Sequence, residues 1–93
     1  MPAISGQKTV TSAGTAVTLG TQDIYGPLMV KALDTNTGAV ALGNDGADDV
    51  TLSNGLRLSA GEVAIFGYVG TLASLWLDAG VNGEGVSWIL LSL

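Results

Sequence analysis

The stretch Val86-Ser87-Trp88-Ile89-Leu90-Leu91-Ser92-Leu93 decides the fold class of this chain. Successive side chains of a β-strand point to opposite faces of the sheet. Alternation gives one face to Val86, Trp88 and Leu90, and the other to Ile89, Leu91 and Leu93. A strand of an isolated antiparallel sheet has one apolar and one polar face, whereas both faces here are apolar. The second face therefore needs a cover, either another part of this chain or a neighbouring molecule, and we expect the neighbouring molecule to provide it.

Turn-forming clusters divide the rest of the chain at short intervals. They are Ser12-Ala13-Gly14, Asn36-Thr37-Gly38, Asn44-Asp45-Gly46, Ser53-Asn54-Gly55, Ser59-Ala60-Gly61 and Asn82-Gly83. The aliphatic and β-branched runs between them predict strands at residues 8–11, 15–19, 28–34, 39–43, 50–52, 56–58, 62–69, 72–78 and 86–92. The fold class is therefore all-β: a small antiparallel β-sandwich, jelly-roll-like, with about eight short strands.

The 93 residues make one domain, which we place at residues 7–93 behind an N-terminal arm at residues 1–6. Alternation along the strands predicts the inward-facing set. Its members are Val10, Val17, Leu19, Leu28, Val30, Ala32, Val40, Leu42, Leu52, Leu58, Val63, Ile65, Leu75, Leu77, Trp88 and Leu90. A second apolar set is left over on the opposite faces: Met29, Leu33, Phe66, Tyr68, Ile89, Leu91 and Leu93.

Charge excludes several classes of partner. Charged residues are 12% of the chain, about half of the ~25% of average globular proteins. The net charge is −5, with three cations at Lys8, Lys31 and Arg57. Nucleic acids and anionic membranes are bound by clusters of Lys and Arg, so we expect neither partner. Residues 1–5 lack the basic and apolar segments of a signal peptide.

The side chains of common catalysis are missing. The chain has no histidine and no cysteine, which removes the commonest general base and the thiolate metal sites. We expect no catalytic residue, no cofactor and no enzymatic activity. Asp45, Asp48 and Asp49 crowd one turn and could hold Ca2+ through their oxygens, but the spacing does not match an EF-hand loop. An exposed acidic hairpin loop is the favoured interpretation.

The apolar surplus and the aromatic residues supply the candidate site. We expect subunit contacts at Phe66, Tyr68, Trp88, Ile89, Leu91 and Leu93. Burying apolar surface stabilises a protein by roughly 25 cal/mol per Å2, and this stabilisation is lost where the surface stays in contact with water. Trp76 lies on the face opposite Leu75 and Leu77 and is the candidate platform on which a sugar ring could stack, with Tyr68 as the alternative.

The strand and turn pattern resembles small structural proteins of tailed-bacteriophage virions across most of the chain. The motifs are Lys8-Thr9-Val10, Gly14-Thr15-Ala16-Val17-Thr18-Leu19, Val40-Ala41-Leu42-Gly43-Asn44, Leu58-Ser59-Ala60-Gly61-Glu62, Leu75-Trp76-Leu77-Asp78 and Asn82-Gly83-Glu84-Gly85-Val86-Ser87-Trp88. The resemblance implies a short, all-β, non-enzymatic protein that decorates or cements a capsid, often as a trimer.

Two functions from different classes follow as expectations. The favoured one is a virion structural protein, a homo-oligomer (trimer favoured) that is assembled in the host cytoplasm. It contacts the major capsid protein or another virion protein on the capsid exterior. The alternative is a ligand-binding module, carbohydrate-binding in particular, of a tail fibre or surface protein. An enzyme is the least favoured class.

Overall fold

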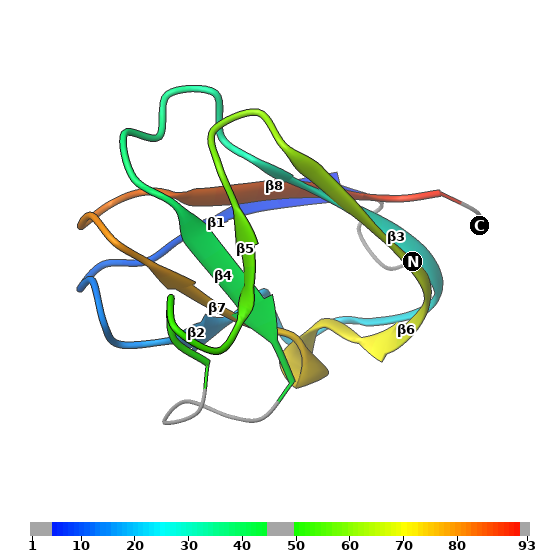
Figure 1. Cartoon of the computed structure of the whole chain (residues 1–93). Helices are drawn as coiled ribbons and strands as arrows, with labels where there is room; N and C mark the ends of the chain where they lie inside the picture. The colour runs from blue at the N-terminus through cyan, green and yellow to red at the C-terminus, as the bar shows by residue number, and fades with distance from the viewer. Residues whose placement is uncertain (1–4, 45–49, 92–93) are drawn as a thin grey trace.

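The structure is a computed structural model that describes residues 5–44 and 50–91. It contains eight strands and one short 3-10 helix (Figure 1). In chain order these are β1 (Ser5–Thr9), β2 (Val17–Thr18), β3 (Asp23–Ala32), β4 (Val40–Gly43), β5 (Leu56–Leu58), β6 (Val63–Thr71), η1 (Leu72–Ser74), β7 (Trp76–Ala79) and β8 (Gly85–Leu90).

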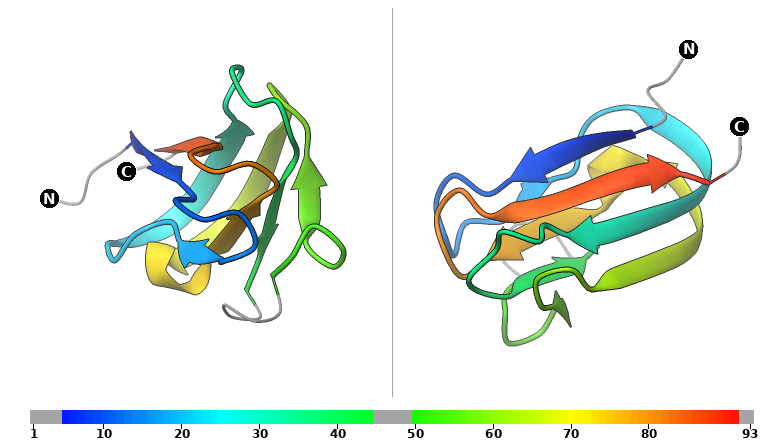
Figure 2. Two further views of the ribbon diagram at one scale, coloured as in Figure 1. Left: turned by 90° about the vertical axis from the view of Figure 1, so that its left-hand side faces the viewer. Right: turned by 90° about the horizontal axis from the view of Figure 1, so that it is seen from above.

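The strands form two four-stranded antiparallel sheets that pack face to face. The first sheet has the order β1-β8-β3-β6, and its four strands lie side by side in the right-hand view of Figure 2. The second sheet has the order β2-β7-β4-β5. Every connection between consecutive strands crosses from one sheet to the other, except the one from β4 to β5. This order is the jelly roll, a double-sheet sandwich that closes through Greek-key connections.

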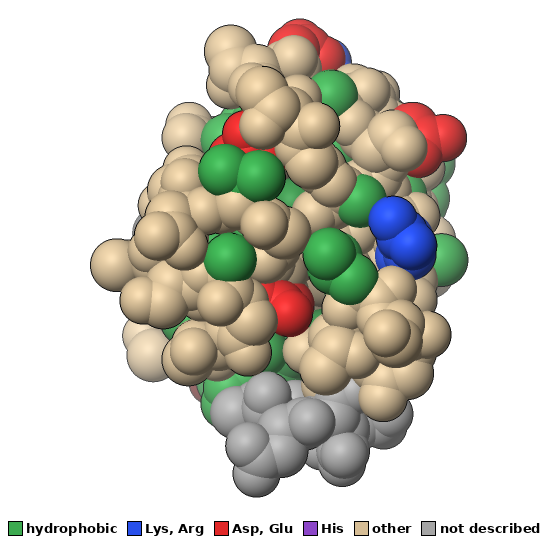
Figure 3. Space-filling model, turned by 60° about the vertical axis from the view of Figure 1, so that its left-hand side comes forward, with side chains coloured by type: hydrophobic (Ala, Val, Ile, Leu, Met, Phe, Trp, Pro, Cys, Tyr) green, Lys and Arg blue, Asp and Glu red, His purple; other side chains and the backbone are tan. Residues whose placement is uncertain are grey.

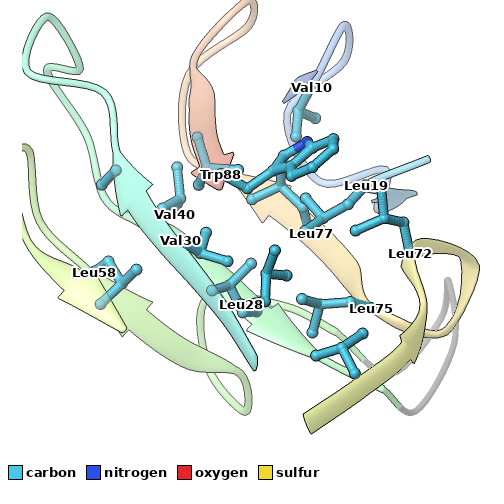
Figure 4. Packing of buried hydrophobic residues seen from close by; sticks show 14 of the residues in the cluster. Val10, Leu19, Leu28, Val30, Val40, Leu58, Leu72, Leu75, Leu77 and Trp88 are labelled. Atoms are coloured by element: carbon cyan, nitrogen blue, oxygen red, sulfur yellow. The ribbon is translucent and has the colours of Figure 1, made fainter. Parts of the chain in front are cut away.

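The core lies between the sheets and follows strand alternation. On β3 every second residue is buried, including Leu28, Val30 and Ala32, none of which is exposed. Their β8 partners on the same face are Leu90, Trp88 and Val86. Leu42 and Leu77, which pair in the second sheet, complete the centre of this cluster. Figure 4 shows the aliphatic side chains of both sheets and the Trp88 indole filling the space between the sheets.

Gly6 allows Trp88 to occupy this position. The two residues pair across β1 and β8, and a Cβ atom at Gly6 would lie 2.7 Å from Cζ2 of the indole. Such a separation is too short for a carbon–carbon contact, so only glycine leaves room for the ring beneath β1. The edge strand and the largest core side chain are thus fitted to each other.

β3 and β6 pair irregularly near their curved ends. The register shifts between Asp23 and Gly26, and again between Gly26 and Leu28. Tyr25 lies in the first shift with a φ of 45°, which is uncommon for a residue with a side chain. Pro27 lies in the second shift, where a missing N–H does not interrupt a regular ladder.

The fold class predicted from the sequence is confirmed, but several element boundaries are corrected. Residues 50–52 form no strand, and residues 72–78 divide into η1 and β7. Strand β3 begins five residues before the predicted start at residue 28, and β2 is shorter than predicted. Ser5 and Gly6 pair with β8, so these two residues of the predicted arm belong to the sandwich.

Two residues that were predicted to face the core lie on the outer face of the sheet instead. Val63 and Ile65 are 45% and 62% exposed. Their neighbours Ala64 and Phe66 pack against the core instead. The register explains this, because Ala64 and Phe66 pair with the buried Val30 and Leu28, whereas Ile65 pairs with Met29 on the outer side.

Candidate interaction surface

A row of apolar side chains crosses the outer face of the first sheet. Ile65 on β6 and Ile89 on β8 are the cross-strand partners of Met29 on β3. Cross-strand partners lie about 5 Å apart, so the three side chains are in contact range. Ile65 is 62% exposed and Ile89 43% exposed.

Two further residues extend this row. Leu91 follows β8, its N–H donates to the carbonyl of Pro27 (2.9 Å), and alternation places its side chain on the same face as Ile89. Val63 lies on β6 two residues before Ile65. We call Met29, Val63, Ile65, Ile89 and Leu91 the outer apolar face. Beside it, Met29, Lys31, Ser87, Trp88 and Ile89 line a shallow depression of about 200 Å3.

Little charge interrupts the outer apolar face. Lys31 lies two residues after Met29 on β3, and its cross-strand partners are Val63 on β6 and Ser87 on β8. Its ammonium is 3.3 Å from Oδ2 of Asp34, and both side chains are well exposed. An exposed pair of this kind contributes at most about 1 kcal/mol. The Lys31 stem can therefore pack against a partner while its charge stays in water.

A hollow of about 410 Å3 opens beside β6 on the inner side of the same edge. Leu42, Gly43 and Asn44 of the second sheet form one wall, with Leu56 of β5. The opposite wall consists of β6 residues 66 and 68–70 together with Ser74 and Leu75. Phe66 and Tyr68 therefore contribute rings to the hollow, and Tyr68 is 66% exposed.

Tyr25 and Asp23 lie at the curved end of β3, close to Tyr68 of β6. The Asp23 carboxylate, through its charge and a hydrogen bond, raises the pKa of the Tyr25 phenol above 10.0, and Tyr68 adds a smaller contribution. Tyr25 is 67% exposed. Tyr25 and Tyr68 are both well exposed, so they present aromatic rings and hydrogen-bonding hydroxyls to the outside.

Polar side chains at the turns have different surroundings, because they hold the fold together. Asp78 is buried, and its Oδ1 accepts from the N–H groups of Gly14 (3.0 Å) and Ala79 (2.8 Å). Glu84 accepts from the N–H groups of Thr37 (2.6 Å) and Gly38 (2.9 Å). These bonds, that from Gly38 most of all, lower the pKa of Glu84 below 4.5.

The end of the molecule with these turns comes forward in Figure 3. Most of its surface is backbone and small polar side chains, with hydrophobic side chains as separate spots. Asn36, buried beneath it, exchanges two hydrogen bonds with the backbone of Gly85. We call this region, which includes residues 36–38, Asp78 and Glu84, the turn end. The Asp78 and Glu84 carboxylates at this end accept hydrogen bonds from backbone N–H groups of the turns.

The predicted contact residues lie in three different environments. Ile89 and Leu91 are on the outer apolar face, and Phe66 and Tyr68 line the hollow. Trp88 is 6% exposed and belongs to the core cluster, as its place in the inward-facing set predicted, so it offers little surface for a subunit contact. Trp76 is half-buried and is not part of the hollow. Leu93 and the calcium candidates Asp45, Asp48 and Asp49 lie outside the described residues.

The sequence analysis missed the role of the long strand β6. Val63 and Ile65 were assigned to the core, whereas they belong to the outer apolar face. Eight large hydrophobic side chains are exposed among the described residues: Tyr25, Leu56, Val63, Ile65, Tyr68, Val81, Ile89 and Leu91. All but Val81 lie on the outer apolar face, around the hollow, or beside Tyr68. The apolar exposure is therefore concentrated on and around β6.

Chemical and membrane features are few in the part of the chain that the structure describes. Residues 5–44 and 50–91 contain no group of three or more acidic, histidine or cysteine side chains placed to hold a metal ion. Over the same residues, no helix has the length and apolar character needed to cross a bilayer.

Comparison with known proteins gave no relative. No family model, curated protein or solved structure matches the chain.

Proposed function

We propose that this protein is a non-enzymatic structural subunit of a bacteriophage virion that decorates or cements the capsid. The observation that carries the proposal is the concentration of exposed aliphatic side chains on the outer apolar face. Contiguous apolar patches on a small domain mark interaction sites. The jelly roll is used in viral capsid proteins, which supports the proposal only by analogy of fold.

The mechanism is mechanical. Outer apolar faces pack against neighbouring subunits, and each Å2 of apolar area removed from water contributes about 25 cal/mol. Repetition over a lattice multiplies this small contribution, so the shell resists rupture. The resemblance to virion proteins implies self-association, as a trimer in the favoured form, and contact with the major capsid protein on the capsid exterior.

The first test compares Leu91→Asp with Val81→Asp. Both residues are similarly exposed, at 46% and 40%, but Val81 lies in the turn between β7 and β8. We expect Leu91→Asp to weaken self-association at least ~10-fold in sedimentation equilibrium, with little change in the urea midpoint of the subunit. Val81→Asp should leave association unchanged. Equal losses of stability and association for Leu91→Asp would contradict the proposal.

The second test places the protein on a particle. Phage particles purified from a culture that carries this gene are expected to contain the chain in a fixed ratio to the major capsid protein. Quantitative mass spectrometry of the purified particles measures that ratio. Recovery of the chain only from the particle-free fraction would contradict a virion role.

The hollow supports a second candidate, a carbohydrate-binding module. Phe66 and Tyr68 offer aromatic rings, and Asn44 and Ser74 offer polar groups, in a hollow of about 410 Å3. Ligand sites combine mainly apolar walls with a few polar groups in this way, and lectins also use jelly rolls. A glycan array distinguishes the candidates, because capsid decoration predicts no signal and sugar binding predicts one that Tyr68→Ala removes.

A further inference from the structure

The four edge strands of the sandwich differ in how well they resist pairing with another chain. Proteins protect sheet edges by making the edge strand short or by placing charge on it. β2 has two residues, and β5 has three including Arg57. β1 has five residues including Lys8. β6 has nine residues, Val63–Thr71, and none of them is charged.

The backbone of β6 has hydrogen-bonding groups available on its outer edge. The N–H of Ala32 donates to the carbonyl of Glu62 (2.9 Å), which fixes the phase of the ladder. Because hydrogen-bonded and non-hydrogen-bonded pairs alternate in an antiparallel sheet, Ala64 and Phe66 bond to β3. The N–H and C=O groups of Val63 and Ile65 therefore point away from β3. Among the described strands β6 pairs only with β3.

We propose that the β6 edge pairs with the β6 edge of a second copy, antiparallel, about a two-fold axis at Ala64. This inference rests on the proposed assembly function and names the contact through which two copies join. Val63 then lies opposite Ile65 of the second copy, and Ile65 opposite Val63. The pairing uses only the regular part of β6, since the register shift begins after Phe66.

Three observations favour a second copy as the occupant. The paired side chains are β-branched and aliphatic, which is a stabilising cross-strand combination. The edge is uncharged, so two chains of net charge −5 meet where neither carries charge. Ile65 also continues the row of Met29 and Ile89, so pairing joins the outer apolar faces of both copies into one surface across six strands.

A contact of standard size would cover a small part of this molecule. A standard interface removes about 800 Å2 per partner, roughly one sixth of the 4832 Å2 surface of the described residues. The β6 edge has apolar side chains on both of its sides: Val63 and Ile65 outside, and Leu56, Phe66 and Tyr68 around the hollow. Side-chain burial therefore accompanies the backbone pairing.

The contact is isologous, so it builds two-fold units. A trimer would instead need a heterologous contact between two different edges. The stoichiometry of the free protein therefore distinguishes β6 pairing from the trimer implied by the resemblance to virion proteins.

The first experiment compares Ile65→Lys with Val81→Lys. Ile65 is 62% exposed, so a lysine there is compatible with the folded subunit but places two like charges beside the two-fold axis. In sedimentation equilibrium we expect the wild type and Val81→Lys at twice the chain mass or, where the outer apolar faces of such pairs associate further, at even multiples of it. Ile65→Lys should dissociate at least ~10-fold more readily, with an unchanged circular dichroism spectrum.

The second experiment uses Ala64→Cys, in a chain that has no other cysteine. At a two-fold axis this residue faces its own copy in a non-hydrogen-bonded pair, whose Cβ separation of about 4.5–5.5 Å is close to that of a disulfide. Mild oxidation should give a covalent dimer. Ile89→Cys, two strands from the axis, should not cross-link.

Two results would overturn the β6 contact. One is a wild-type chain that stays monomeric at every concentration, which also removes the support for an assembly function. The other is an oligomer that Ile65→Lys leaves intact and Ala64→Cys does not link. If Leu91→Asp dissociates that oligomer, the assembly function stands and only the β6 contact fails.

Discussion

Trp88 and Ile89 are consecutive residues of β8 with opposite surroundings. The indole of Trp88 is 6% exposed and lies under β1 among side chains of both sheets. Ile89 is 43% exposed and pairs with Met29 in the outer row of its own sheet. The same contrast recurs on β6, where Phe66 packs toward the core and Ile65 is 62% exposed.

The contrast between the two faces of this sheet shows where apolar area is in surplus. One face is enough to complete the interior, because the second sheet covers it. The outer face has aliphatic residues where an isolated antiparallel sheet has polar ones. They lie outside the interior of the subunit, and this is the physical basis for proposing contacts between subunits.

The largest effect that tests this contrast is expected from Trp88→Ala. Removing a buried indole leaves a cavity that the two sheets cannot close, so we expect a loss of about 3–5 kcal/mol in the free energy of unfolding. Ile89→Ala should change it by no more than about 0.5 kcal/mol when the subunit is monomeric. Urea unfolding at low protein concentration measures both changes.

A small domain has little stability to lose, so Trp88→Ala could fail to fold. Trp88→Phe, which keeps an aromatic ring in the core, then replaces it and should show a smaller loss. A loss for Ile89→Ala as large as that for either Trp88 variant would erase the distinction between the faces.

A smaller effect is expected on β6 from Phe66→Ala. The Phe66 ring packs against the core but also borders the hollow. The expected loss is about 2 kcal/mol, below the ~3–5 kcal/mol of a fully enclosed aromatic side chain. Ile65→Ala should stay within about 0.5 kcal/mol of the wild type in monomer stability. The opposite ranking would restore the original prediction that Ile65 faces inward.

The sequence was sufficient to predict the alternation of β3 but not that of β6. The charged Lys31 identifies the solvent-facing side of β3. By alternation, Leu28, Val30 and Ala32 could therefore be assigned to the side that faces the core. β6 reads Val-Ala-Ile-Phe-Gly-Tyr-Val-Gly-Thr, with no charged residue to mark its outer face. Either phase buries aliphatic side chains, so only the register with β3 decides between them.

Other features depended on long-range contacts as well. Turn residues predicted short strands and a sandwich, and that much is confirmed. They say nothing about the order β1-β8-β3-β6, which places the first strand beside the last. The positive φ of Tyr25 and the fit of Gly6 to the Trp88 ring arise from pairing and packing between distant segments. The surplus of apolar residues was visible in β8 but its centre on β6 was not.

The smallest expected effect is the loss of folding stability at acidic pH. We expect it to come from the turn end and not from the outer apolar face. That face has Lys31 as its charged neighbour, in an exposed pair with Asp34. At the turn end, hydrogen bonds from Gly38 and Thr37 lower the pKa of Glu84 below its unfolded value of 4.5. A carboxylate with a lowered folded pKa stabilises the fold above the unfolded pKa, and this stabilisation disappears as the pH falls through the folded pKa.

Glu84→Gln should therefore lower the urea midpoint at about pH 7, and its difference from the wild type should shrink as the pH approaches about 3. The substitution replaces one acceptor oxygen by an NH2 group that faces the backbone donors of the β3–β4 turn. Glu62→Gln is the matched control, because its carboxylate accepts from one backbone N–H, that of Ser59. It should show a smaller difference at neutral pH. A Glu84→Gln difference that stays constant down to acidic pH would mean that the charge of Glu84 does not contribute to the stability of the fold.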